Sequence, residues 1–207
     1  MVNSDGPTNA INECNGELIS ADSRHDKSFA AEGVLDDLAL AIEQLEARLE
    51  TLAGKARALI AQEPTLNARY ALLLGVKGVG ETSAIALLGE LALAPPHLTH
   101  KQWVKWAGLN PSAFQSGKSI DKKARLSKAG NRYIRQALYM PALSARTHDP
   151  HVRAYAEHLI KNGKLPMQAI CAVMRKLLHA IHGMFKDNQP FDNTRFYDLK
   201  TANIAGQ

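Results

Sequence analysis

The sequence is poor in cysteine, in aromatic residues and in long apolar runs. Two cysteines, Cys14 and Cys171, are too few for a disulfide framework and cannot form a CxxC metal pair. Their scarcity favours a reducing, cytoplasmic setting. The first thirty residues have neither a basic segment nor an apolar core, so we expect no secretory signal peptide. No apolar run approaches the length of about 18 residues that a membrane span needs, so we expect no membrane partner.

Acidic residues are scarce in the part of the chain that follows residue 50. The first fifty residues carry eleven acidic and three basic side chains, a net charge of −8. Because the 207-residue chain has a net charge of +5, the remainder carries +13. An acidic front and a basic body predict that the body binds a polyanion, above all nucleic acid.

Strand-like alternation is almost absent, so the sequence predicts a mostly α fold. We expect an N-terminal coiled-coil helix followed by a compact helical domain that contains a helix-hairpin-helix. The predicted divisions are a disordered or remnant leader at 1–33, the coiled-coil helix at 34–62, a helical DNA-binding domain at 63–187 and a polar tail at 188–207.

The segment from Leu35 to Leu59 has the most regular apolar pattern. Its apolar residues alternate spacings of three and four, which is the seam of a heptad repeat. One interpretation is a coiled coil that makes the chain a homodimer. The other is a single amphipathic helix that packs on its own domain. The seam consists of Leu35, Leu38, Ile42, Leu45, Leu49, Leu52, Ala56 and Leu59.

Local signals mark the ends of the later helices. We expect Thr99 to cap one helix, and Asp149-Pro150 and Pro166 to begin two others. Pro141 is a candidate kink within a helix. The predicted helical segments in this part of the chain are 66–74, 81–91, 131–146, 150–160 and 167–185.

The glycine-rich segment "GVKGVGETSA" lies between two predicted helices. It is not a phosphate-binding loop of the Walker type, because Glu81 stands where that motif needs lysine. A helix-hairpin-helix fits better, because Gly78 and Gly80 would allow a tight reversal and expose backbone amides to a phosphate. The Thr82 hydroxyl could add a donor. The alternative is a structural turn between two core helices.

The stretch "FQSGKSIDKKARLSKAGNRYIR" is the most basic part of the sequence. It contains seven basic residues and one acidic residue, Asp121, whereas a solubilising surface normally mixes charges of both signs. We therefore predict a clamp for the phosphate backbone, with Arg132 and Arg135 on one face of a following helix. The predicted nucleic-acid-binding cations are Lys118, Lys122, Lys123, Arg125, Lys128, Arg132 and Arg135.

Ser116 lies inside this basic stretch. No neighbouring His–Asp pair is available to activate it, so chemistry alone gives weak support for a nucleophile. Nearby cations would nevertheless stabilise the charge that develops during phosphoryl transfer. The histidines, in contrast, have no companion ligands at zinc spacing, and we expect no metal site among them. They are His148, His151, His158, His179 and His182.

Four motifs occur in order: "LLLGVKGVGETSAIALLGEL", "WVKWAGLNPSAFQSGKS", "LSKAGNRYIRQALY" and "GKLPMQAICAVMRKLLHAI". Together they resemble the C-terminal transposase domain of serine/DEDD insertion-sequence transposases related to pilin-gene invertases. The resemblance covers 66–185. It implies a recombinase that acts on DNA, uses a structured guide RNA and dimerises through the preceding coiled coil. It also implies that Ser116, of the Ser116-Gly117 pair, is the nucleophile that becomes joined to DNA.

Members of that family also carry an N-terminal RNase H-like domain with four metal-binding acids, for which the sequence before residue 66 has no room. We therefore expect no cofactor in this chain, and a divalent metal, Mg²⁺ above all, in that other domain. The resemblance leaves several roles open: half of a split enzyme, a remnant, or a non-enzymatic regulator or inhibitor that forms mixed oligomers with a full-length transposase. A helix-hairpin-helix repair accessory is a further alternative.

Overall fold

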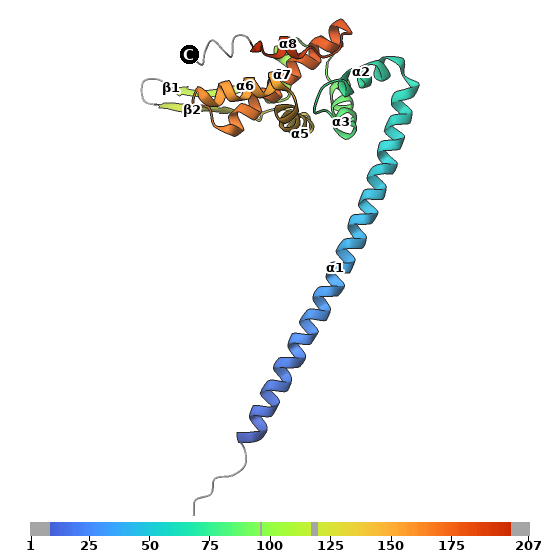
Figure 1. Ribbon diagram of the computed structural model, residues 1–207, viewed down its shortest axis with the longest axis vertical. Helices are drawn as coiled ribbons and strands as arrows, with labels where there is room; N and C mark the ends of the chain where they lie inside the picture. The colour runs from blue at the N-terminus through green and yellow to red at the C-terminus, as the bar shows by residue number, and fades with distance from the viewer. Residues whose placement is uncertain (1–8, 96, 117–119, 200–207) are drawn as a thin grey trace, which may run out of the picture. The chain divides into compact units, whose positions relative to one another are not determined.

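The computed structural model describes residues 9–95, 97–116 and 120–199 (Figure 1). The chain divides into two units, 1–52 and 53–207. Helices dominate, which confirms the mostly α prediction. The elements are α1 (Asn9–Gln62), α2 (Pro64–Leu74), α3 (Glu81–Ala92), α4 (His100–Trp106), β1 (Pro111–Ser116), β2 (Ile120–Leu126), α5 (Arg132–His148), α6 (Pro150–Lys161), α7 (Pro166–Asp187) and α8 (Asn193–Phe196).

Helix α1 begins at Asn9 and not near residue 34, where we predicted the helix to start. No proline occurs between Asn9 and Gln62, so no residue of this segment lacks the backbone N–H that a continuous helix needs. The seven large apolar seam residues are all between 52% and 66% exposed. This exposure leaves the predicted seam available to a partner, and the coiled coil itself remains a prediction.

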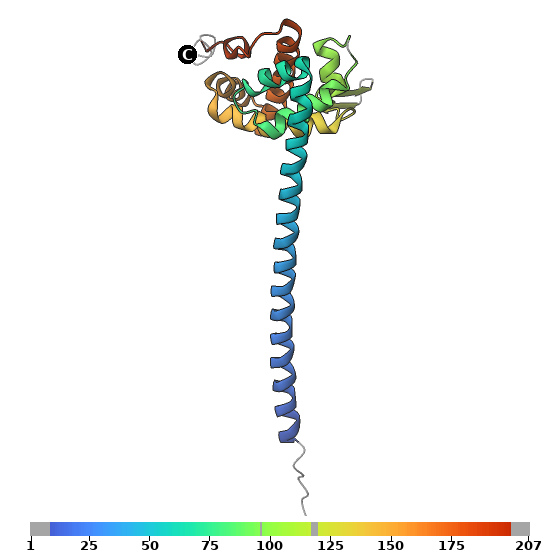
Figure 2. The same cartoon turned by 90° about the vertical axis from the view of Figure 1, so that its right-hand side faces the viewer.

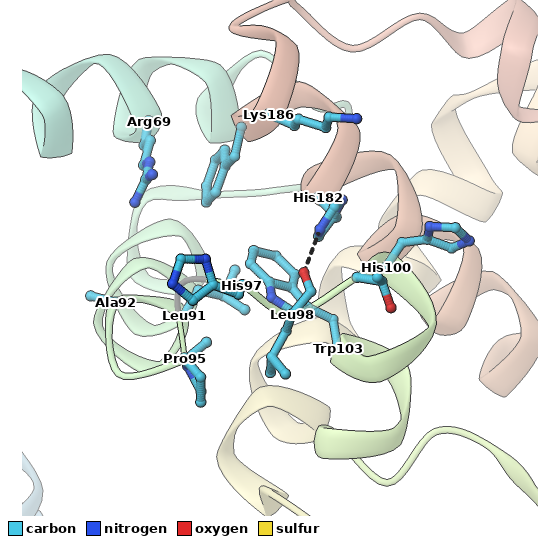
Figure 3. Close-up of a pocket in the computed structure, with 13 residues that line it drawn as sticks. Arg69, Leu91, Ala92, Pro95, His97, Leu98, His100, Trp103, His182 and Lys186 are labelled. Atoms are coloured by element: carbon cyan, nitrogen blue, oxygen red, sulfur yellow. Dashed lines mark hydrogen bonds between the residues drawn. The ribbon is translucent and has the colours of Figure 1, made fainter.

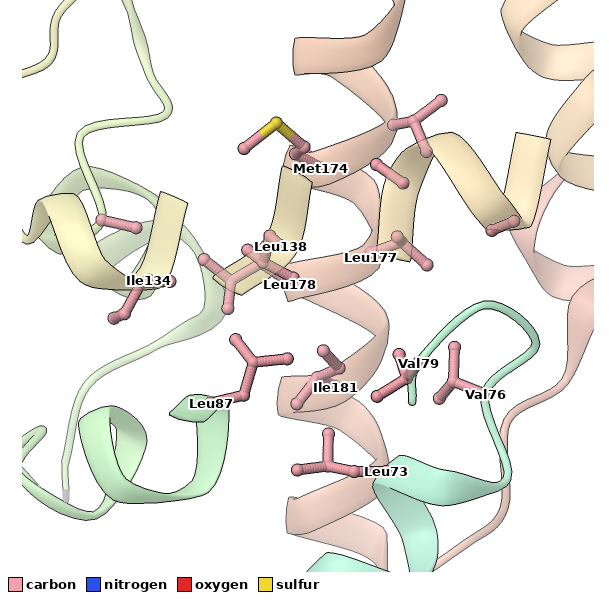
Figure 4. Packing of buried hydrophobic residues seen from close by; sticks show 14 of the residues in the cluster. Leu73, Val76, Val79, Leu87, Ile134, Leu138, Met174, Leu177, Leu178 and Ile181 are labelled. Carbon is pink, nitrogen blue, oxygen red and sulfur yellow. The ribbon is translucent and has the colours of Figure 1, made fainter. Parts of the chain in front are cut away.

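Helix α7 forms the centre of the core of the second unit (Figure 4). Its apolar residues recur every three or four positions, so they form one continuous stripe. Leu177, Leu178 and Ile181 are almost completely buried in this stripe. Around them pack residues of α2, α3, α5 and the turn after α2, namely Leu73, Val76, Val79, Leu87, Ile134 and Leu138.

The predicted helix starts are confirmed in atomic detail. Thr99 caps α4 in a capping box with Gln102. Asp149 is 1% exposed, and its carboxylate accepts hydrogen bonds from the backbone N–H groups of His151 and Val152. Pro150 and Pro166 occupy the first positions of α6 and α7. Pro141 lies inside α5, and the helix continues past it.

Two features of the second unit depart from the sequence analysis. The basic stretch, for which the sequence predicted no strand, forms an antiparallel β-hairpin of β1 and β2 (Figure 2). Helix α8 lies in the segment expected to be a polar tail, and its Phe196 is 3% exposed. The Lys176 ammonium lies 4.3 to 5.6 Å from three ring centroids beside it, which ties α8 to α6 and α7. These rings belong to Tyr155, Phe196 and Tyr197.

Candidate nucleic-acid interface

The hairpin carries the predicted nucleophile and three of the predicted nucleic-acid-binding cations. Ser116 is the last residue of β1 and pairs with Ile120, the first residue of β2. Lys122, Lys123 and Arg125 follow on β2. Lys118 lies outside the described residues. The serine and three of the predicted cations thus belong to one two-stranded element.

The register of the hairpin contains a bulge. Phe114 pairs with Lys122, and Ser112 pairs with Arg125, so two steps along β1 correspond to three steps along β2. Directly paired positions share a face of a hairpin, as do alternate positions along a regular strand. The extra residue in β2 therefore brings positions 122 and 125 to the face that contains position 116. Without the bulge, positions 122 and 125 would lie on opposite faces.

Backbone hydrogen bonds hold the base of the hairpin. The N–H of Ser127 donates to the carbonyl of Asn110 at 2.9 Å, and that of Asn131 donates to the carbonyl of Trp106 at 2.7 Å. Gly130, at φ +148°, passes so close to the Trp106 carbonyl that a Cβ atom there would overlap it. The two chain segments that flank the hairpin are therefore packed backbone to backbone.

Arg135 reinforces this base and is only partly exposed. One guanidinium nitrogen of Arg135 donates to the carbonyls of Ala107, Gly130 and Asn131, at 2.8, 3.3 and 3.3 Å. Arg132 is exposed, and its guanidinium lies 4.9 Å from the Tyr133 ring centroid. Arg132 is thus available to a ligand, whereas at least part of Arg135 has a structural role.

Lys128 and Asn131 lie in the segment that links the hairpin to α5. Lys128 is exposed and adopts a left-handed backbone conformation, at φ +55°. Asn131 caps α5: its side-chain oxygen accepts from the N–H groups of Tyr133 and Ile134, and its amide donates to Glu90 of α3 at 2.6 Å. Asn131 therefore fixes the start of α5 against α3.

The sequence left two roles open for the glycine-rich turn between α2 and α3, a structural turn or a phosphate contact, and its glycines differ in this respect. Gly78, at φ +97°, is a packing residue, because a Cβ atom there would lie 2.6 Å from the Ala145 nitrogen and 2.8 Å from the Pro141 oxygen. Gly80 faces open space and precedes α3 without a side-chain cap. Thr82 is exposed. Only the Gly80 end of the turn is open to a phosphate.

Glu81, the first residue of α3, has local partners for its charge. Its carboxylate accepts from Arg57 at 2.9 Å and from the Tyr70 hydroxyl at 3.2 Å. The hydrogen bond from Arg57 is the main reason that the pKa of Glu81 lies below its ordinary value. Burial, followed by the Glu81 charge, raises the pKa of Tyr70. Sequence reasoning missed this trio, because Arg57 is 24 residues from Glu81.

The basic hairpin and the glycine turn do not form a single site. The base of the hairpin adjoins Asn131, at the start of α5, whereas Gly78 packs against Pro141 and Ala145. The separation along α5 is ten to fourteen residues, or about 15–21 Å at a helical rise of about 1.5 Å per residue. Any shared ligand must therefore be extended, as a nucleic-acid backbone is.

Two further observations concern the described residues alone. No three histidine, cysteine or acidic side chains among them gather as metal ligands would. None of their helices combines the length and apolar character needed to cross a bilayer.

Comparison with known proteins relates this region to transposases. Residues 70–157 match the model of the family described as "Transposase IS116/IS110/IS902 family". This segment contains the glycine turn, the hairpin and α5. The match supports a relationship of this region to the transposase family.

Individual relatives give the same picture. The chain is 33% identical over 130 residues to a pilin gene-inverting protein of Moraxella bovis, a match that covers 62% of the chain and 40% of the relative. It is 27% identical over 164 residues to an insertion element IS110 protein of Streptomyces coelicolor, covering 78% of the chain and 40% of the relative. A putative transposase of Sinorhizobium fredii is 34% identical over 119 residues, a match that covers 50% of the chain and 30% of the relative. The chain thus spans well under half the length of these relatives.

Proposed function

We propose that this chain supplies the DNA-binding and strand-exchange part of an insertion-sequence transposase or site-specific recombinase, with Ser116 as the nucleophile. The observation that carries the proposal is the basic hairpin, which has Ser116 and two cationic positions on one face by register. It lies inside the segment that matches the transposase family, and one relative is named for inverting a pilin gene.

The proposed chemistry is a transesterification at a DNA phosphate. The Ser116 hydroxyl oxygen forms a bond to phosphorus as the bond from phosphorus to one sugar oxygen breaks. The serine loses a proton and the leaving sugar oxygen gains one, so the step needs no oxidant or reductant. Lys122 and Arg125 would stabilise the negative charge that grows on the phosphoryl oxygens.

The family resemblance implies a composite site that an RNase H-like domain completes with a divalent metal, Mg²⁺ above all. In this proposal the metal-binding domain acts with the serine hairpin, whichever polypeptide carries it. A structured guide RNA is a further proposed partner, because the basic hairpin would bind the phosphate backbone of RNA as well as that of DNA.

Salt-dependent binding tests the DNA-contact part of the proposal. A variant with Lys122→Gln, Lys123→Gln and Arg125→Gln should bind duplex DNA more weakly and reduce the slope of log K against log salt by up to about 3, since each phosphate contact contributes about 0.9. Lys164→Gln, in the turn between α6 and α7, is the matched control. Absence of affinity of the wild-type chain for duplex DNA and structured RNA at low salt would refute DNA contact.

A covalent adduct tests the role of Ser116. The chain is mixed with a relative that carries the metal-binding domain, with its DNA and Mg²⁺, and protein–DNA adducts of this chain are measured on denaturing gels. We expect an adduct that Ser116→Ala abolishes and that Ser112→Ala retains. An adduct that survives in Ser116→Ala would exclude Ser116 as the nucleophile.

Helix α1 supports a second candidate function, that of a non-enzymatic dimerising regulator or inhibitor of a complete transposase. Its exposed seam would pair with a second copy or with the corresponding helix of a full-length transposase. Sedimentation should detect a dimer that Ile42→Gln with Leu49→Gln dissociates and that Glu43→Gln with Glu46→Gln retains. If Ser116→Ala leaves every effect on recombination unchanged, the regulator is favoured over the enzyme.

A further inference from the structure

A groove of about 730 Å³ opens among α2, the end of α3, α4, α7 and the segment that joins α3 to α4 (Figure 3). Its volume lies within the range of pockets that hold a small molecule or one unit of a polymer. No described residue of the hairpin lines it. The groove extends from the His100 end of α4 to Trp103, whereas the base of the hairpin adjoins Trp106, about 5–9 Å farther along this helix.

The charged residues that line the groove are all cationic. Arg69 of α2 and Lys186 of α7 reach it, and no acidic residue belongs to its lining. The Arg69 guanidinium lies 5.3 Å from the Phe185 ring centroid and has no carboxylate partner among the described residues. This aromatic contact orients the guanidinium without neutralising it, so Arg69 remains able to bind an anion.

The groove also offers aromatic rings. Trp103 meets His182 edge to face at a centroid distance of 4.9 Å, and it meets Phe185 in the same manner at 6.3 Å. All three rings are only half-buried. His182 is fixed by a hydrogen bond between its Nε2 and the Leu98 carbonyl, at 3.0 Å. A planar ligand would therefore meet rings whose positions are already set.

Cations beside aromatic rings are the combination that binds unpaired nucleotides, because rings stack on bases while cations bind phosphates. We propose that this groove binds an unpaired nucleotide, with its base against Trp103 and its phosphate between Arg69 and Lys186. The inference rests on the proposed function, since strand exchange exposes unpaired nucleotides. The groove lies within about 10 Å of the base of the hairpin, and Ser116 lies about 20 Å farther along β1, so a displaced strand would have to extend over several nucleotides to reach the groove.

Intrinsic fluorescence provides a direct test. The chain has two tryptophans, so Trp106→Phe leaves Trp103 as the only reporter. In this background we expect 5′-phosphorylated tetranucleotides of dT or of U to quench the fluorescence. The tetranucleotide that binds more tightly shows whether the groove prefers unpaired DNA or unpaired RNA. An abasic tetranucleotide should bind roughly 5- to 100-fold more weakly, the loss expected for one stacked base.

Charge variants test the second half of the site. Arg69→Gln with Lys186→Gln should weaken tetranucleotide binding and reduce its salt slope by up to about 1.4, because each contact to a single strand contributes about 0.7. Lys164→Gln should change neither. Arg69→Lys keeps the charge and should retain most of the binding, and far-UV circular dichroism checks that each variant is folded.

The proposal is overturned if the tetranucleotides cause no quenching, if the abasic strand binds equally well, or if folded Arg69→Gln with Lys186→Gln binds as the parent does. Equal quenching by poly-glutamate would also overturn it, because the groove would then be a general anion site. Duplex binding that depends on Lys122, Lys123 and Arg125 is measured separately. If the chain binds tetranucleotides but not duplex DNA, DNA contact by the hairpin is refuted and the nucleotide site stands. If it binds duplex DNA but not tetranucleotides, the nucleotide site is refuted and DNA contact by the hairpin stands.

Discussion

Replacing Gly78 by alanine should lower the free energy of unfolding of the helical unit by about 2–5 kcal/mol. The backbone at φ +97° costs an L-residue about 1–2 kcal/mol. The new Cβ atom would lie 2.6 Å from the Ala145 nitrogen and 2.8 Å from the Pro141 oxygen. Both are backbone atoms of α5, so relief requires a shift of the helix, and such overpacking costs about 1–3 kcal/mol.

Gly80→Ala is the matched control in the same turn. Its φ is −86°, and no heavy atom lies within 4 Å of the position that a Cβ would take. Only the weaker preference of alanine for the N-cap position opposes this change, at a cost of up to about 1 kcal/mol. Urea unfolding followed by circular dichroism measures both variants, and an unchanged m-value shows that the midpoint reports stability.

The paired variants distinguish packing from ligand contact. A Gly78→Ala protein that unfolds at the wild-type midpoint would refute the steric reasoning. If that protein also lost affinity for DNA, Gly78 would serve the approach of a phosphate and not the packing of α5. Loss of stability in Gly78→Ala alone, with binding retained by the folded protein, would support the packing role.

Three further changes test other parts of the second unit. Asn131→Ala should lower the free energy of unfolding in urea by about 1–2 kcal/mol, because it removes the cap of α5. Asn131→Asp keeps an acceptor for the cap but places a second carboxylate beside that of Glu90. Burial, and then neighbouring positive charges, hold the pKa of His179 below the ordinary 6.5, so the unfolded chain binds the proton first. The melting temperature should therefore fall as the pH drops below about 6.5, and His179→Gln should flatten this decline. Phe196→Ala should lower the free energy of unfolding by about 3 kcal/mol, because it leaves a cavity beside Lys176. An unchanged midpoint of urea unfolding would mean that α8 does not pack as described.

The helix ends of the second unit were predictable because their signals are local. A hydroxyl or carboxylate just before a helix can accept hydrogen bonds from its first free amides, and proline fits where no amide is needed. Thr99, Asp149, Pro150 and Pro166 all act in this way. The three-and-four spacing of α7 likewise predicted its buried stripe, because it depends on a single period.

The hairpin and the division of the candidate site depend on contacts between distant residues. Charged residues dominate β2, so the strand lacks the usual alternation, and only its pairing with β1 reveals it. The position of Arg135 in the sequence suggested a free cation, and nothing nearby indicated that it meets the Ala107 carbonyl. The sequence shows that residues 78 and 130 are glycines. It does not show why, because the backbone atoms that leave no room for a Cβ atom at Gly78 and Gly130 belong to other elements.

The closure of the hairpin has a consequence for protein engineering. Its base is held by main-chain atoms of 106–110 and 127–131, by Arg135, which donates to carbonyls, and by Leu126, which packs against the core. The segment 111–125 can therefore be regarded as an interchangeable cassette. Hairpins from related transposases, or of altered length, should graft between these fixed ends without redesign of the helical scaffold.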